Sequence, residues 1–150
     1  MAGTYTKLVY HIIFSTKDRE PLVTPKLRET LYPYIGGIIR GQDSTLQAIG
    51  GMPDHIHLVA RLKADISVSE IVRLVKANSS KWVNEQTDCA GRFAWQSGYG
   101  AFSVSLSQLA AVCEYVQNQE AHHRKRTFQD EYQEFLKRHD VSFEEKRRWG

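Results

Sequence analysis

Apolar residues follow two different spacings along this chain, and the order of those spacings predicts its secondary structure. Residues 6–15 are rich in Val, Ile, Tyr and Phe and predict a mostly buried strand. Residues 44–51 and 55–62 predict two further strands, paired as an antiparallel hairpin around a turn at 52–54. Residues 24–41 predict a helix with a threonine cap, a proline at the first helical position, and apolar residues at helical spacing: Leu27, Leu31, Tyr34, Ile35 and Ile38.

The second half of the chain continues this alternation. Ser67 and Glu70 form a capping box that opens a helix to about Asn84, with a buried stripe of Ile71, Leu74, Val75 and Trp82. Residues 93–105 hold strand-like residues interrupted by glycines, which predicts a bent or bulged strand. A third helix begins at Ser105 with a capping signature, and its apolar face holds Leu109, Val112, Cys113 and Val116.

The predicted order is β-α-β-β-α-β followed by helices. This is the ferredoxin-like, split βαβ arrangement of an α+β protein, an antiparallel sheet with an additional C-terminal helix. The first two helices should cover one sheet face, and Ile56, Leu58 and Leu62 should point toward them. Residues 1–150 are expected to form a single domain, of which about 127–150 is a charged, partly helical tail.

Composition is that of an ordinary globular protein, with 41% hydrophobic and 25% charged residues. No run of about 18 apolar residues is present, so no membrane span is expected, and the start of the chain lacks the pattern of a secretory signal. Two cysteines outside any CxxC pair favour a reducing, cytoplasmic setting. The net charge of +3 is too small to indicate a nucleic-acid partner by itself.

The most informative motif is His55-Ile56-His57, directly after the predicted turn. Side chains alternate along a strand, so both imidazoles should project from the face opposite Ile56, where they could form half of a metal site. A bare His-x-His pair also arises by chance, as incidental polar residues on a half-exposed strand.

Tyr115 and Gln119 lie four residues apart on the third helix and should share one face. They fall at the border of its apolar stripe, so they could be ordinary surface residues or could face a cleft. Together with the histidine pair they fit metal-assisted attack of a phenol on a phosphodiester, because two imidazoles and an amide oxygen leave open positions on a divalent cation. A covalent phosphotyrosine would preserve the bond energy for rejoining.

The motifs MPDHIHLV and YVQNQ resemble those of the single-tyrosine HUH transposases of bacterial insertion sequences, the IS200-like TnpA type. HUH denotes histidine, bulky hydrophobic, histidine, which His55-Ile56-His57 matches. The resemblance extends from YHIIFSTKDR through WQSGYGAFSVS to HHRKR, which is most of the chain.

This resemblance implies a DNA transposase that cleaves and rejoins single-stranded DNA at insertion-sequence ends through a 5′-phosphotyrosine intermediate. It implies Tyr115 as the nucleophile and His55, His57 and Gln119 as ligands of Mg²⁺ or Mn²⁺. It also implies DNA hairpins as partners, a bacterial cytoplasmic, nucleoid-associated location, and a homodimer in which one subunit's tyrosine helix can complete the other's site. The third helix is expected to begin close behind the fourth strand, with Tyr115 only about two turns in. This short lead would limit how far the helix folds back over the histidines of its own chain, which also favours a site completed by the partner subunit.

Basic residues near the second and third helices could hold DNA phosphates or form a solvated surface: Arg73, Lys76, Lys81, Arg124, Lys125 and Arg126. Two other functions stay open at this point. One is a domesticated, non-mobile HUH endonuclease. The other is a non-catalytic, RRM-like nucleic-acid-binding domain, which would need base-stacking aromatics on its central strands, where this chain places His55 and His57.

Overall fold

The fold is built on one antiparallel sheet. The computed structural model describes residues 3–86, 91–123 and 127–139. Its strands run in the order β2-β3-β1-β4, where β1 is Leu8–Ser15, β2 Thr45–Met52, β3 His55–Leu62 and β4 Gly100–Ser103. This order, with a helix between β1 and β2 and another between β3 and β4, confirms the ferredoxin-like α+β class.

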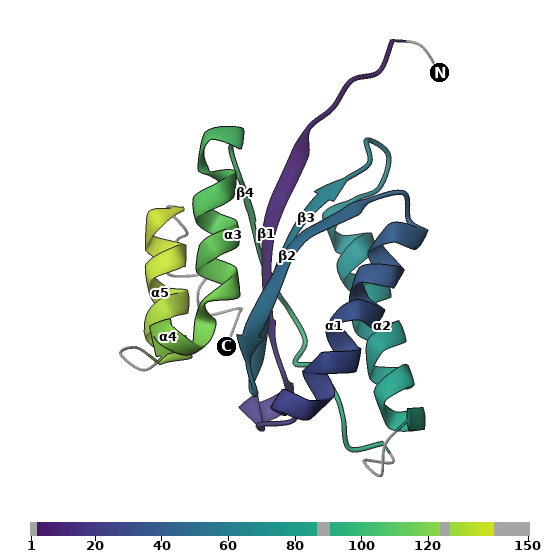
Figure 1. The fold of residues 1–150 in the computed structure, drawn as a ribbon, viewed down its shortest axis with the longest axis vertical. Helices are drawn as coiled ribbons and strands as arrows, with labels where there is room; N and C mark the ends of the chain where they lie inside the picture. The colour runs from purple at the N-terminus through teal and green to yellow at the C-terminus, as the bar shows by residue number, and fades with distance from the viewer. Residues whose placement is uncertain (1–2, 87–90, 124–126, 140–150) are drawn as a thin grey trace.

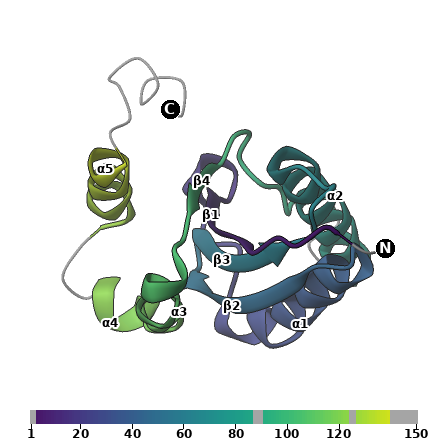
Figure 2. The same ribbon diagram turned by 90° about the horizontal axis from the view of Figure 1, so that it is seen from above.

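Helices cover both faces of the sheet. On one face lie α1 (Pro25–Gly41) and α2 (Val68–Gln86); on the other lie α3 (Leu109–Gln117), α4 (Gln119–His123) and α5 (Phe128–Arg138) (Figures 1 and 2). Short 3₁₀ turns, η1 (Lys17–Arg19) and η2 (Leu106–Gln108), follow β1 and precede α3. None of the helices in the described ranges is both long and apolar enough to cross a bilayer.

The main core lies between the sheet and the first pair of helices. Ile56, Leu58 and Leu62 point into it, as predicted. The predicted caps of α1 and α2 form, since the Thr24 hydroxyl accepts from the Leu27 N–H at 3.1 Å, and the Ser67 hydroxyl accepts from the Glu70 N–H at the same distance. The predicted cap at Ser105 is wrong, because its side chain makes no capping hydrogen bond. Of the predicted stripe of α2, Ile71 and Val75 are buried as expected, whereas Leu74 and Trp82 are only half-buried. The other buried residues of this helix are Val72, Ser79 and Val83.

A smaller apolar cluster lies between α3 and the sheet face opposite α1 and α2. Val116 of α3 packs against Val9, Ala48 and Val59. The backbone of α3 comes so close to β2 here that a Cβ at Gly50 would fall 2.9 Å from the carbonyl carbon of Val116 and closer still to its oxygen. Only glycine therefore fits at this position of β2.

Two predicted elements are shorter than expected. The strand predicted over 93–105 is reduced to Gly100–Ser103, because the preceding residues form an irregular segment whose Trp95 indole donates to Ser79 Oγ of α2 at 2.9 Å. The third helix starts at Leu109, after the 3₁₀ turn, rather than at Ser105. Within the predicted charged tail, α5 is a docked helix, with Phe128, Tyr132 and Leu136 packed against Ile13 and Phe102.

Candidate functional site

His55 and His57 lie side by side on β3, on the sheet face covered by α3 and α5. Both side chains are 0% exposed, and their ring centroids are 5.2 Å apart. Ile56 and Leu58 point the other way into the main core, so the predicted alternation of faces is confirmed. Because helices cover this face, its strands offer no open platform for stacking bases, which argues against the RRM-like alternative.

Both histidines are held from behind through Nδ1. His55 Nδ1 lies 2.8 Å from Asp54 Oδ1, and His57 Nδ1 lies 2.8 Å from Nε2 of His11, a buried residue of β1. Such partners fix the ring and leave Nε2 facing inward, which is the usual arrangement of metal-binding histidines. The sequence pattern did not reveal His11. In the register of β1 with β3, Ile13 lies directly opposite His57, and His11, two residues away on β1, contacts His57 diagonally.

Tyr115 and Gln119 both reach the histidine pair, although they do not lie on one continuous helix. α3 ends before Asn118 and α4 begins at Gln119, so the predicted shared helical face is wrong. Gln119 is buried, and its Oε1 lies 3.2 Å from His55 Nε2. The ring of Tyr115 stands edge-on to that of His57, with centroids 6.0 Å apart.

The turn at Asn118 explains how one chain assembles these groups. The N–H of Asn118 bonds back to the carbonyl groups of both Glu114 and Tyr115, which tightens and closes α3. Gln119 follows as the first residue of α4, and its side chain reaches His55. The expectation that the short lead before Tyr115 would keep it from its own histidines is wrong, because α3 docks on the sheet directly through Val116.

Glu131 of α5 lies at the centre of the cluster, and the sequence pattern did not identify it. Its side chain is 2% exposed. Oε1 lies 3.0 Å from His57 Nε2, 3.5 Å from His55 Nε2 and 3.3 Å from His123 Nε2. Oε2 accepts hydrogen bonds from the Tyr115 hydroxyl and from the side-chain amide of Gln119.

Burial and hydrogen bonding set the protonation of the cluster. Burial lowers the pKa of His57 to about 4 and that of His11 to about 3. Burial also opposes charge on His55, but its hydrogen bonds to Asp54 and Glu131 outweigh this effect and raise its pKa. For Glu131 burial favours the neutral acid, yet hydrogen bonds from the surrounding histidines hold the carboxyl pKa well below its usual range. The site therefore combines a charged carboxylate with a neutral imidazole.

The donor set fits a divalent cation. Within the described residues, ligand atoms of His55, His57 and Glu131 all lie within 4.8 Å of one another. Imidazole nitrogens with amide and carboxylate oxygens are ligands that Mn²⁺ accepts, and the oxygens suit Mg²⁺. The predicted ligands His55, His57 and Gln119 are thus brought together in space.

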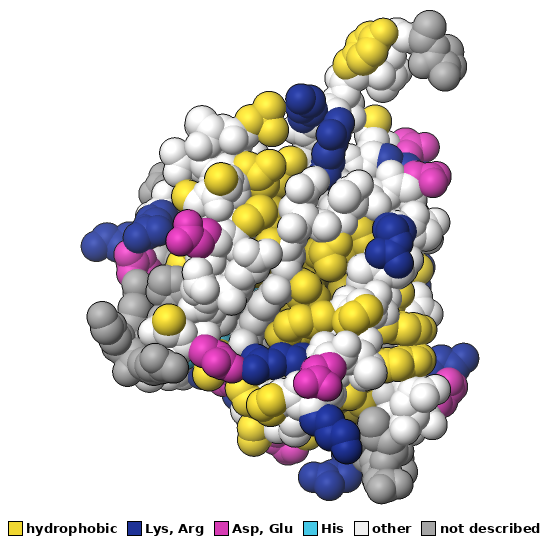
Figure 3. Space-filling view, in the orientation of Figure 1, with side chains coloured by type: hydrophobic (Ala, Val, Ile, Leu, Met, Phe, Trp, Pro, Cys, Tyr) yellow, Lys and Arg dark blue, Asp and Glu magenta, His cyan; other side chains and the backbone are white. Residues whose placement is uncertain are grey.

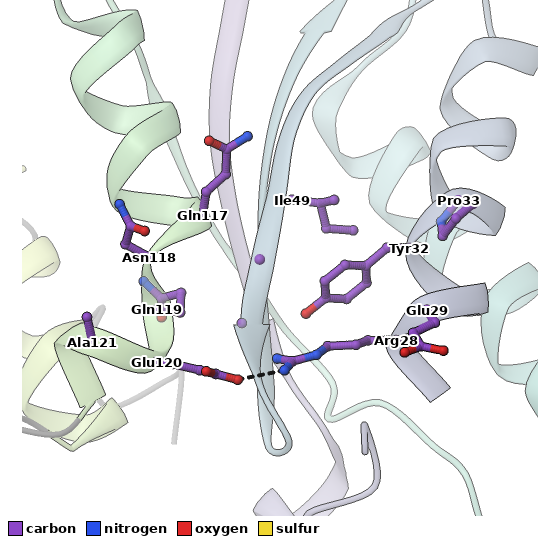
Figure 4. A pocket seen from close by; sticks show the side chains of 12 residues that line it. Arg28, Glu29, Tyr32, Pro33, Ile49, Gln117, Asn118, Gln119, Glu120 and Ala121 are labelled. Carbon is purple, nitrogen blue, oxygen red and sulfur yellow. Dashed lines mark hydrogen bonds and ion pairs between the residues drawn. The ribbon is translucent and has the colours of Figure 1, made fainter. Parts of the chain in front are cut away.

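A cavity of about 640 Å³ lies beside the cluster, between α1 and the junction of α3 and α4 (Figure 4). Arg28 and Tyr32 of α1 line one side, and Gln119 lines the other. Glu120 reaches across and pairs with Arg28 at 2.6 Å. A cavity of this size is typical of sites for small organic groups.

The basic residues proposed for DNA lie elsewhere or are already engaged. Arg73, Lys76 and Lys81 belong to α2, on the sheet face opposite the histidines. Arg73 pairs with Glu70 at 2.6 Å, and the ammonium of Lys76 donates to the carbonyl groups of two residues in the segment before β4. On the face drawn in Figure 3 the Lys and Arg side chains stand apart rather than in one patch. Three others lie outside the described residues: Arg124, Lys125 and Arg126.

A ferredoxin-like sheet carrying a histidine pair beside a tyrosine is the arrangement expected from the resemblance to single-tyrosine HUH transposases. The family model for IS200-like transposases matches residues 4–119 of this chain. The chain belongs to that family. The match ends at Gln119, so α5 and its Glu131 lie beyond it.

Individual relatives agree with this assignment. The chain is similar to the ISDra2 transposase TnpA of Deinococcus radiodurans, with 21% identity over 122 residues that span 78% of this chain and 87% of the relative. Its fold is similar to a crystal structure of a candidate transposase from Deinococcus radiodurans R1, with a TM-score of 0.63, 24% identity, and coverage of 79% and 95% of the two chains. It is also similar to a REP-associated tyrosine transposase bound to a REP hairpin, with a TM-score of 0.59, 16% identity, and coverage of 77% and 68%.

Proposed function

We propose that this chain cleaves and rejoins single-stranded DNA at insertion-sequence ends, with Tyr115 as nucleophile and His55, His57 and Gln119 as ligands of Mg²⁺ or Mn²⁺. One observation carries the proposal: the Tyr115 hydroxyl and the Nε2 atoms of both histidines converge on the same buried carboxylate. These groups come from different elements of the fold. The two sequence motifs from which the activity was predicted, the histidine pair and the tyrosine segment, therefore meet at one site, which would be unexpected by chance. Membership of the transposase family supports DNA transposition as the overall activity.

The proposed reaction is an exchange of phosphodiester bonds. The phenolate oxygen of Tyr115 attacks phosphorus, the bond from phosphorus to the 3′ oxygen breaks, and a 5′-phosphotyrosine forms. The phenol loses one proton and the departing 3′ oxygen gains one, so the step consumes no net acid, base or water. A bound divalent cation would neutralise charge on the phosphate and orient it for attack. Attack by another 3′-hydroxyl reverses the step and rejoins the strand.

The residues of this chain prepare the nucleophile and exclude water. A tyrosine with an ordinary pKa of about 10 is a weak nucleophile near neutrality, so its hydroxyl has to be held in place. The hydrogen bond from Tyr115 to Glu131 and the edge-on contact with His57 do this. The histidine pair is fully buried beside Tyr115, and exclusion of water from this site during the reaction would favour rejoining over hydrolysis of the phosphotyrosine.

Single-stranded DNA with hairpin ends is the proposed substrate. The similar REP-associated transposase is bound to a hairpin, which supports this choice. The cavity beside Gln119 offers room for a nucleotide next to the scissile bond. Arg73, Lys81 and the basic residues at 124–126 remain proposed phosphate contacts, whereas the bonds of Lys76 within the chain favour a structural role for it.

A homodimer is also part of the proposal, on the basis of the family resemblance. The structure assembles Tyr115, His55, His57 and Gln119 within one chain. A dimer would therefore not need to exchange tyrosine helices to complete its sites. We expect the protein to act on DNA in the bacterial cytoplasm.

Covalent capture of DNA tests the proposed nucleophile. Labelled single-stranded end DNA with Mn²⁺ should give a protein–DNA adduct on a denaturing gel with the unmodified chain, and none with Tyr115→Phe. Tyr34→Phe is the matched control, because Tyr34 stacks on Trp82 on the other sheet face. An adduct that persists in Tyr115→Phe would assign the nucleophile elsewhere. Strand transfer to a second oligonucleotide would separate a transposase from a non-mobile endonuclease, which would cleave without rejoining.

A further inference from the structure

We propose that Glu131, on α5, is itself a ligand of the divalent cation. This inference rests on the metal site of the proposed function and adds a residue beyond the part of the chain that the family model matches. With Glu131 the site becomes two imidazoles, an amide oxygen and a carboxylate, assembled from β3, α4 and α5.

The position of the carboxylate is the first argument. Its Oε1 lies 3.0 Å from Nε2 of His57 and 3.5 Å from Nε2 of His55. These are the two nitrogen atoms that the outer partners Asp54 and His11 leave free to bind a metal. The same oxygen therefore lies where a shared cation would be bound.

The orientation of the carboxylate is the second argument. Its other oxygen, Oε2, accepts from the Tyr115 hydroxyl and from the amide of Gln119 at 3.3 Å. These bonds turn Oε1 toward the histidines and keep it there. One carboxylate thereby links the proposed nucleophile to the proposed metal site, and it would fix the distance between them.

The burial of Glu131 is the third argument. α5 is anchored by Phe128, Tyr132 and Leu136, which pack against the sheet without help from Glu131. Its other acidic residues include Glu134, which pairs with Arg138 near the surface. A carboxylate buried to 2% exposure beside an apolar anchor is unfavourable unless positive charge meets it there. A divalent cation bound by the facing imidazoles supplies that charge.

The chemistry of the donor set is the fourth argument. Two imidazoles and an amide carry no negative charge, and Mg²⁺ in particular prefers carboxylate oxygens. Two histidines with one carboxylate form a site with open positions, as attack on a phosphate requires. A glutamine at position 131 would keep the shape and the hydrogen-bonding reach of the side chain but would remove its charge.

Metal binding to the full chain without DNA tests this inference apart from activity. Mn²⁺ is titrated into the protein, and free Mn²⁺ is followed by its electron paramagnetic resonance signal, with calorimetry for affinity. We expect the unmodified chain to bind Mn²⁺ and Glu131→Gln to bind it at least about tenfold more weakly. Glu134→Gln, three residues away on the same helix, should bind like the unmodified chain. Glu131→Asp keeps the charge on a shorter arm and should retain part of the affinity.

The outcomes separate this inference from the proposed function. If Glu131→Gln binds Mn²⁺ as tightly as the unmodified chain, or more tightly, and His55→Ala binds it poorly, Glu131 is not a ligand but the histidine site stands. Tighter binding by Glu131→Gln would show that Glu131 excludes the cation. Binding by none of the proteins, the unmodified chain included, would overturn the metal site as a whole. Circular dichroism of each variant shows whether α5 and the sheet remain folded, and Glu131→Asp carries the test if Glu131→Gln does not fold.

Discussion

Gly50→Ala is a small change that should separate α3 from the sheet. Gly50 lies on β2, opposite His57 of β3 in the strand register. A Cβ placed there would meet the backbone of Val116, 2.9 Å from its carbonyl carbon and closer to its oxygen. Both partners are backbone atoms, so no side chain can rotate away, and α3 has to move.

The size of the effect follows from this contact. The Val116 carbonyl oxygen is the nearest atom, and it has to retreat by roughly 1.5 Å or more to reach ordinary van der Waals separation. Val116 is the fully buried contact of α3 with Val9 and Val59, so the shift loosens that packing at a cost of about 1–3 kcal/mol. For a chain of this length this corresponds to roughly 3–10 °C in Tm. Tyr115, the proposed nucleophile, precedes Val116 directly, and a displacement of about 1 Å at a reacting group can lower a rate by about 100-fold.

Thermal unfolding and single-turnover adduct formation measure the two effects separately. Gly41→Ala is the control, because a Cβ at Gly41, the last residue of α1, meets nothing within 4 Å. We expect Gly41→Ala to match the unmodified chain in both assays and Gly50→Ala to lose stability and, more strongly, adduct formation. A Gly50→Ala chain with unchanged Tm and unchanged rate would refute the close docking of α3 on β2.

Two further predictions concern acid and subunit exchange. Without added metal, the chain should lose stability as pH falls from about 6.5 toward 4. The reason is that His57 and His11 take up protons in the unfolded chain, whereas in the fold their pKa values are lowered to about 4 and about 3. The free energy of unfolding should fall by on the order of 1.4 kcal/mol per pH unit per histidine, as measured by denaturant unfolding at about pH 7, 5.5 and 4.5. A flat profile would mean that these histidines are hydrated. Mixing Tyr115→Phe chains with His55→Ala chains under confirmed exchange should restore no adduct, since Tyr115 and Gln119 lie beside the histidines of their own chain. Recovery would show a site shared across a dimer.

The fold was predictable from the sequence where local rules govern it. β3 begins and ends at the predicted residues, because the turn at 52–54 and the alternation of Ile56 and Leu58 with the histidines leave little choice of register. The caps of α1 and α2 are also local and formed as predicted. The segment before β4 was assigned wrongly because its aromatic residues, Phe93 and Trp95, pack into the core from an irregular backbone.

The candidate site was only half predictable, for a physical reason. His55, His57, Tyr115 and Gln119 are found by spacing within short motifs, and the structure brings them together. His11 touches His57 only through the pairing of β1 with β3, which no local pattern encodes. Spacing in the charged tail did hold a signal, because Phe128, Tyr132 and Leu136 recur every four residues and mark a docking face.

Glu131 would tie the protonation of the site to the proposed metal binding. Hydrogen bonds to Asp54 and Glu131 raise the pKa of His55, so protonation of His55 would provide positive charge for the buried carboxylate. A cation on the same Nε2 would provide that charge instead, and the two cannot occupy one nitrogen. Metal and proton therefore compete for His55, and lowering the pH should weaken metal binding beyond the effect of acid on the fold. Glu131→Gln removes the carboxylate whose charge the proton or the cation would neutralise. It should therefore weaken the binding of the cation and of the proton on His55 alike.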